Sequence, residues 1–147
     1  MLVYSTPPLG GDVEVTGPVT VTLWASSSAI DTDFTAMLID VSPGGEAFNL
    51  CDGIVRARWR ASRAKPALLT PGKPEKFEID LVATSNVFKK GHRIRLEVSS
   101  SNFPRFDRNL NTGKGFASED CTTATNTVFH DASHPSYVEL DIVPRGA

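Results

Sequence analysis

Little in this sequence points to a surface for nucleic acid or for a membrane. Its 147 residues carry 15 Lys and Arg against 17 Asp and Glu, for a formal net charge of -2. Domains that bind nucleic acid are usually clearly basic, so no nucleic-acid partner is expected. No apolar run approaches the roughly 20 residues that span a bilayer, and the first four residues lack the charged start and the apolar stretch of a signal peptide. We therefore expect no membrane contact and a cytoplasmic location.

Cysteine is equally scarce, with Cys51 and Cys121 the two in the chain. Neither belongs to a C-x-x-C pair, which excludes a zinc ribbon. Two interpretations stay open. In the first, both thiols are reduced and buried, because cysteine is often a core residue. In the second, one disulfide joins them and stabilises the fold by about 3–4 kcal/mol through the loop that it closes.

Helical periodicity is missing too, and an alternation of apolar and polar residues takes its place. No window of about 11 or more residues repeats every 3.6 positions, whereas most apolar segments repeat every second position. This alternation is typical of antiparallel strands with one buried and one solvated face. The predicted strands cover residues 13–16, 19–26, 34–41, 54–60, 76–81, 93–98, 126–130 and 137–142.

About eight strands without a helix predict an all-β fold, an antiparallel β-sandwich or barrel, as a single domain over residues 1–147. The 11 glycines and 10 prolines cluster between the strands, where turns are expected. Two stretches, 61–74 and 101–125, are predicted as long loops. Loops of this length in a compact domain usually serve a function or an interface.

Arginine recurs at every second position near the end of the segment 54–60. Arg56, Arg58 and Arg60 are therefore predicted on one solvated strand face, where acidic residues of a neighbouring strand such as Glu78 and Asp80 pair with them. A phosphate-binding surface is the alternative. The slightly negative net charge favours the first interpretation.

The motifs of nucleophilic catalysis are absent from the sequence. An α/β-hydrolase needs its serine in a G-x-S-x-G turn between a strand and a helix, and the chain contains no such motif. Ser62 and Lys65 match S-x-x-K in spelling, but the S-D-N and K-T-G elements of a β-lactamase do not follow. We expect no catalytic residue in this chain and no hydrolase activity from it alone.

Metal and cofactor sites are not expected either. His130 and His134 are spaced as ligands on a helix would be, yet they fall at a strand end and in a turn. Asp31, Asp33 and Asp40 offer oxygen ligands without the spacing of an EF-hand. Side chains of Asp in turns commonly bond the nearby backbone, and that role is predicted for Asp31 and Asp33.

Several segments, in order and over nearly the whole chain, resemble one family. The most distinctive is Ser99–Asn109 (SSSNFPRFDRN). The others are residues 3–9, 13–18, 31–36, 50–56, 84–88, 91–94 and 134–136. Together they resemble the C-terminal domain of the CocE/NonD serine hydrolases, which include cocaine esterase and X-Pro dipeptidyl-peptidases.

The resemblance implies a jelly-roll sandwich with a galactose-binding-like fold. In the family this domain packs against an α/β-hydrolase domain that carries a Ser-Asp-His triad, and it helps shape the substrate cleft. None of the triad positions falls within this sequence, so no catalytic residue is transferred. Domains of the family begin upstream of the part matched here, which implies an N-terminally truncated domain and a catalytic domain elsewhere in the parent chain.

Two elements are predicted to face the catalytic domain. Alternation in the segment 19–26 places Trp24 on the polar face, and large aromatics there are typical of interfaces. The loop NFPRFDRN offers Phe103, Arg105 and Phe106. Either this loop merely caps the sandwich, or loop and Trp24 face form the dock, with self-association of the isolated chain as a consequence. A stand-alone carbohydrate-binding module with an aromatic platform is the alternative function.

Overall fold

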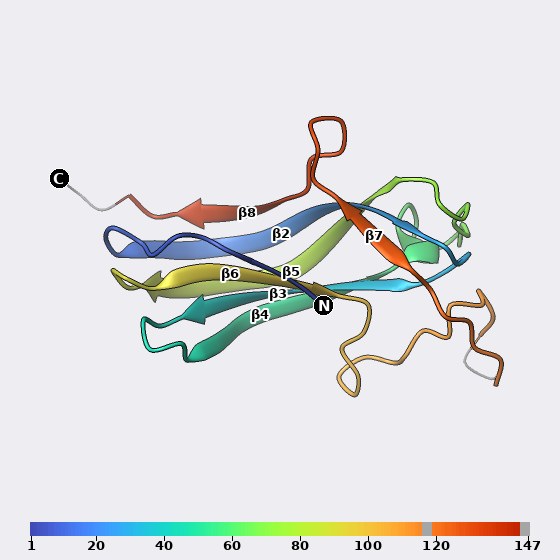
Figure 1. The fold of residues 1–147 in the computed structure, drawn as a ribbon, viewed down its shortest axis with the longest axis horizontal. Coiled ribbons are helices and arrows are strands. Elements are labelled where there is room, and N and C mark those ends of the chain that lie inside the picture. Colours follow the sequence, from blue (N-terminus) through green and yellow to red (C-terminus); the bar gives the residue numbers. More distant parts are fainter. Residues whose placement is uncertain (116–118, 145–147) are drawn as a thin grey trace.

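The computed structural model describes residues 1–115 and 119–144 and shows two antiparallel sheets packed face to face (Figure 1). The all-β sandwich predicted from the alternation is therefore confirmed. The first sheet is formed, in spatial order, by β1 (Leu2–Ser5), β6 (Arg93–Ser99), β3 (Asp33–Val41) and β4 (Ala47–Arg56). The second is formed by β5 (Glu75–Phe88), β2 (Val13–Ser27), β7 (Asn126–Phe129) and β8 (Tyr137–Ile142).

The long strand β2 organises the second sheet. It pairs with β5 on one side from Val13 to Ala25, and on the other side with β8 and then with β7. A register shift between Pro18 and Thr20 bends it, which explains why the sequence pattern divides it into two strands. Its inward residues, Val15, Val19, Val21 and Leu23, are fully buried as the alternation predicts.

Two other boundaries differ from the prediction. The strand β1 was not predicted from alternation, because all four of its residues are exposed and it lacks a polar–apolar pattern. The predicted strand 54–60 ends at Arg56, and Ala57–Trp59 forms the 3-10 turn η1. The Ala57 N–H donates to the Thr32 carbonyl at 2.8 Å and thereby turns the chain out of the sheet.

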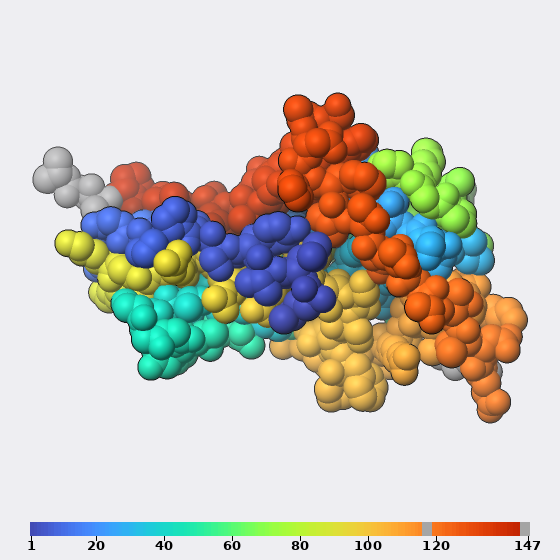
Figure 2. Space-filling model, in the orientation of Figure 1, coloured from blue at the N-terminus to red at the C-terminus, as the bar shows by residue number. Residues whose placement is uncertain are grey.

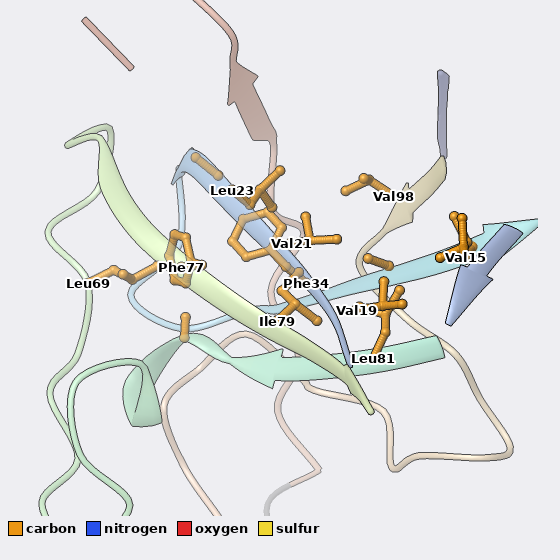
Figure 3. Packing of buried hydrophobic residues seen from close by; sticks show 14 of the residues in the cluster. Val15, Val19, Val21, Leu23, Phe34, Leu69, Phe77, Ile79, Leu81 and Val98 are labelled. Carbon is orange, nitrogen blue, oxygen red and sulfur yellow. The ribbon is translucent and has the colours of Figure 1, made fainter. Parts of the chain in front are cut away.

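The core lies between the two sheets and consists of interdigitating aliphatic and aromatic side chains (Figure 3). Phe34 of β3 and Phe77 of β5 meet with their ring centroids 4.8 Å apart. Ile79, Leu81 and Phe88 of β5 are fully buried with them. Burial of each such side chain contributes about 1.5–3 kcal/mol to folding, so the core alone accounts for the pairing of the sheets.

The sandwich is closed along one side, where β4 approaches β5. A Cβ atom on Gly53 would lie 2.1 Å from the Asp80 carbonyl oxygen and 3.3 Å from a methyl carbon of Ile79. No side chain fits in that space, so glycine at position 53 allows the two sheets to meet. Among the described residues the single helical element is the three-residue η1, far too short to cross a bilayer.

Replacing Gly53 by alanine is expected to force β4 away from β5. Overpacking of this kind costs about 1–3 kcal/mol, and the free energy of unfolding in urea should fall by at least that amount. Gly11→Ala is the matched control, because nothing lies within 4 Å of a Cβ built there. Equal stabilities of the two variants would contradict the close approach of the sheets.

Candidate interdomain surface

The long loop between β6 and β7 lies at the end of the sandwich where β2 turns into β3 (Figure 1). It begins with the segment most characteristic of the family resemblance. Side chains from three elements hold it: the β2–β3 turn, the end of β4 and η1. The way in which they hold it decides which residues are presented to a partner.

Two buried carboxylates, Asp31 and Asp33, form the centre of this end of the molecule. Their relative exposures are 0% and 1%. Arg56 makes a bidentate pair with Asp33, with Nε at 2.9 Å and Nη2 at 3.0 Å from its two oxygens. The Arg58 backbone N–H donates to Asp31 at 2.9 Å, and Arg58 Nε lies 3.4 Å from the other oxygen of the same carboxylate. A charge-assisted bidentate pair such as Arg56–Asp33 is the stronger kind of hydrogen-bonded contact.

The hydrogen bond from Arg56 to Asp33 raises the pKa of the Arg56 guanidinium, although burial opposes the shift. A buried carboxylate is tolerated only when its charge is paired and its oxygens are hydrogen-bonded, and both conditions are met at Asp33.

Asn109 connects the long loop to these carboxylates. Its Nδ2 donates to Asp31 at 3.1 Å and to Asp33 at 2.8 Å. Its Oδ1 accepts the backbone N–H of Asn111 at 2.9 Å. Further along the loop, Arg58 Nη1 donates to the Gly113 carbonyl at 2.9 Å. The loop is thus tied to the sandwich at two successive points.

A second anchor holds the first part of the loop on β4. Asp52 accepts a hydrogen bond from Asn102 Nδ2 at 2.7 Å and pairs with Arg105 Nη2 at 3.1 Å. The Arg105 guanidinium lies 5.6 Å from the centroid of the Phe106 ring, within cation–π range. The Arg105 side chain nevertheless remains 64% exposed, and Phe103 is 69% exposed. The loop therefore presents an aromatic ring and a cation from a braced backbone.

Trp24 lies on the second sheet, where residues of the β7–β8 connection cover it. Its ring centroid is 5.1 Å from that of His134, in an edge-on arrangement, and its backbone N–H donates to Ser136 Oγ at 2.9 Å. His134 is held in turn by Asp131, whose pKa is lowered by the backbone N–H of Ser133. Trp24 is half-buried as a result.

The four predicted interface residues therefore separate into two places. Ring and hydrogen-bond contacts tie Trp24 to the β7–β8 connection. Arg105 pairs with Asp52 of β4 and lies against the Phe106 ring, and Phe103 belongs to the same loop. Of these four residues, Phe103 and Arg105 are the exposed ones. That they face a partner stays a prediction.

The predicted pairing of the arginines is wrong. Arg56 and Arg58 turn toward Asp31 and Asp33, and Arg60 lies 3.6 Å from Glu75. Residues 57–59 form a 3-10 turn, so the alternation of arginine does not reflect a strand face. Asn109 was not singled out from the sequence, because an asparagine in a loop carries no signal until its partners are known.

The structure also places the other candidates named from the sequence. Cys51 and Cys121 are free thiols, and Cys121 is exposed rather than buried, whereas Cys51 is half-buried and its pKa is raised by burial and by Asp52. Asp40 pairs with His92 Nδ1 at 2.8 Å. Across residues 1–115 and 119–144, no group of three His, Cys, Asp or Glu residues is placed to hold a metal ion.

Removing the carboxylate of Asp33 should be among the most damaging single changes at this end of the molecule. Asp33→Ala leaves Arg56 largely buried without its main counter-charge, a defect that costs about 3–5 kcal/mol. Lys89→Ala, which breaks the exposed Lys89–Asp12 pair at 3.3 Å, should cost less than about 1 kcal/mol. Urea unfolding measures both, and similar losses would contradict the structural role of the buried pair.

Asn109→Ala tests the link to the loop separately. It removes two hydrogen bonds to the buried carboxylates of Asp31 and Asp33, and hydrogen bonds to charged groups contribute about 1.5–3 kcal/mol each. We expect faster amide hydrogen exchange in residues 102–115 while exchange in β3 and β5 remains slow. Unchanged exchange in the loop would show that Asn109 does not hold it.

Comparison with known proteins agrees with this architecture. The family described as the X-Pro dipeptidyl-peptidase C-terminal non-catalytic domain matches residues 1–139. A cocaine esterase from Rhodococcus sp. (strain MB1 Bresler) is 51% identical over 148 residues, which cover 99% of this chain and 26% of that protein. A putative Xaa-Pro dipeptidyl-peptidase from Streptomyces avermitilis is 28% identical over 139 residues, 67% of this chain and 21% of that protein.

Solved structures give the same picture. An α-amino acid ester hydrolase superimposes with a TM-score of 0.92 at 34% identity, over 97% of this chain and 25% of that chain. A CocE/NonD family hydrolase from Staphylococcus aureus, at 18% identity, shares the fold with a TM-score of 0.78 over 97% of this chain and 30% of that one. The chain thus spans about a quarter of the length of the curated relatives cited here. It belongs to the family of X-Pro dipeptidyl-peptidase C-terminal non-catalytic domains, the β-sandwich part of CocE/NonD hydrolases.

Proposed function

We propose that this domain docks on the α/β-hydrolase catalytic domain of the same parent chain, stabilises it and helps to shape its substrate cleft. The observation that carries the proposal is the part of the β6–β7 loop from Asn102 to Gly113, which is held by the contacts described above and is called the braced loop. Two sets of buried or half-buried ionic contacts hold its backbone, yet Phe103 and Arg105 project from it into solvent. Aromatic and Arg side chains on a pre-organised backbone are the usual anchors of an interface, because little conformational entropy is lost on binding.

The printed names of the relatives suggest the chemistry of the parent chain. They are an esterase, an ester hydrolase and a dipeptidyl-peptidase, all of which transfer an acyl group to water. We propose that the parent hydrolyses an ester or an amide with a serine nucleophile in its catalytic domain. The present chain, as one domain over residues 1–147, contributes structure to that reaction.

The docking proposal is tested by changing exposed residues of the loop in the parent hydrolase and in the isolated domain. Phe103→Ser should lower the thermal midpoint of the parent, because interface anchors are worth about 2 kcal/mol or more. Arg105→Glu should lower it by more than it lowers that of the isolated domain, where the loss of the Arg105–Asp52 pair acts alone. The isolated domain should change little with Phe103→Ser, since that side chain is 69% exposed.

Phe48→Ser is the matched control, as this β4 residue is 57% exposed and lies far along the sheet from the braced loop. It should leave both proteins unchanged. If the parent tolerates Phe103→Ser and Arg105→Glu as well as it tolerates Phe48→Ser, the loop is not the dock.

The isolated chain should show no serine-hydrolase activity, because its sequence contains no G-x-S-x-G motif. Incubation with a fluorophosphonate probe and with an activated aryl ester measures this. Stoichiometric labelling of one serine, with turnover that disappears when that serine is mutated, would contradict the assignment of chemistry to another domain.

Self-association of the isolated chain and a cytoplasmic location stay predictions. Sedimentation of the purified domain tests self-association.

A further inference from the structure

The loop between η1 and β5 contains a short stretch, residues 61–66, that is held at its two ends. At the near end, the Arg60 N–H donates to the Ala57 carbonyl at 3.2 Å. At the far end, the Ala67 N–H donates to the Arg58 carbonyl at 2.7 Å. In Figure 2 the light green part of this loop lies on the surface at one end of the molecule, beside the light blue β2–β3 turn. Residues 61–66 therefore form a small surface loop whose ends are fixed and close together.

The backbone of residues 61–66 has few partners. Within the part of the chain that the structure describes, its recorded hydrogen bonds run from the Ala64 and Lys65 N–H groups to Ser62 Oγ, at 3.1 and 3.2 Å, and no backbone–backbone bond ties it to a strand. Ser62 is half-buried and the other residues of the stretch are exposed. Proteases cut preferentially in segments with this little burial and hydrogen bonding, because the backbone must leave the fold to enter the active site of the protease.

Arg63 is the residue of this stretch that suits a protease best. An endoprotease of trypsin-like specificity cuts the bond after a cationic side chain, and residues 61–66 contain two cations, Arg63 and Lys65. Lys65 is followed by Pro66, whose ring and missing N–H hinder cleavage of the bond between them. The guanidinium of Arg60 is occupied by two backbone carbonyls, at 3.0 and 2.6 Å, and 12% of its side chain is exposed. The bond after Arg63 is therefore the accessible one.

The other long loop also carries cations, but it is held more closely. The bonds after Arg105 and Arg108 both lie within the braced loop. Arg105 pairs with Asp52 at 3.1 Å, and Asn109, the residue after Arg108, donates to two buried carboxylates. Opening the braced loop for a protease would break these contacts, whereas opening residues 61–66 disrupts the bonds within that stretch.

A break after Arg63 would divide the chain between two groups of strands that interlock. Residues 1–63 contain β1 to β4, and residues 64–147 contain β5 to β8. In the first sheet β6 lies between β1 and β3, and in the second β2 lies between β5 on one side and β7 and β8 on the other. Among the strand pairings of the described residues, that of β3 with β4 is the one within a single half. Each half thus inserts one strand into the sheet formed mainly by the other.

The core and the buried charges also join the two halves. Phe34 of the first half meets Phe77 of the second with the ring centroids 4.8 Å apart. The buried carboxylate of Asp33 accepts a hydrogen bond from Asn109 of the second half at 2.8 Å. Separation of the halves would expose this apolar core to water, which is unfavourable in proportion to the area exposed.

We propose that the peptide bond between Arg63 and Ala64 is a cleavage site for a trypsin-like endoprotease, and that cleavage leaves a folded domain made of two interlocked fragments. Water gives its oxygen to the Arg63 carbonyl carbon, which becomes a carboxylate, and its two protons to the Ala64 nitrogen, which becomes an ammonium terminus. The protease supplies the nucleophile and the acidic pocket for the guanidinium. The site belongs to this domain alone and does not depend on docking through the braced loop.

Limited digestion of the isolated chain with trypsin, followed by intact-mass measurement, tests the site. The first products should be residues 1–63 and 64–147. Arg63→Gln should slow the first cut at least about tenfold, because the other sites require opening of better-held backbone. Arg108→Gln, at an exposed arginine of the braced loop, is the matched control and should leave the first cut unchanged. A first cut elsewhere, or equal rates in the two variants, would overturn the proposal.

The cleaved protein tests the interlocked fold. In gel filtration under native conditions it should elute as the uncut chain does, with both fragments in one peak and with an unchanged circular dichroism spectrum. Its thermal midpoint should lie several degrees below that of the uncut chain and should rise with protein concentration, because refolding now requires two fragments to meet. Separate elution of the fragments, or the spectrum of an unfolded chain, would overturn the proposal.

Discussion

Asp31 and Asp33 are buried at one end of a β-sandwich, and the local structure follows from the requirement that their charges be paired. Arg56 and Arg58 approach from the end of β4 and from η1, and Asn109 reaches them from a loop more than 70 residues away in sequence. Each of these contacts removes freedom from a segment that has little apolar burial of its own. The carboxylates thus convert an irregular loop into a fixed surface, from which Phe103 and Arg105 project.

The two long sides of the sandwich differ. Along one side, Gly53 lets β4 and β5 meet with no room for another side chain. Along the other, β1 leaves an apolar groove and an unprotected strand edge.

Much of the fold could be predicted from the sequence, because one buried face gives a strand its alternation. β2, β5, β6 and β8 follow that rule, and the core residues Val21, Leu23, Phe77 and Ile79 were identified by it. β3 was predicted instead as a central strand from its apolar residues on both faces, and both of its faces are buried. β1 was not predicted, because a strand exposed on both faces has no alternation of apolar and polar residues. The three arginines were wrongly predicted on one strand face, because their spacing of two residues runs through η1 and not along a strand.

The candidate surface could be predicted only in part. Phe103, Arg105 and Phe106 stood out as an aromatic and cationic loop, and Trp24 as an aromatic on a polar face. That Trp24 is covered by His134, while Phe103 is exposed, depends on which loop folds over which sheet, a long-range outcome that local sequence does not determine. The role of Asn109 depends in the same way on carboxylates far away in sequence.

The central claim is that the braced loop is an interface in the intact hydrolase. Hydroxyl-radical footprinting of Phe103 compares its accessibility in the isolated domain with that in the parent protein under identical conditions. We predict rapid modification of Phe103 in the isolated domain and strong protection in the parent, with Phe48 modified equally in both. Equal modification of Phe103 in the two proteins would contradict it.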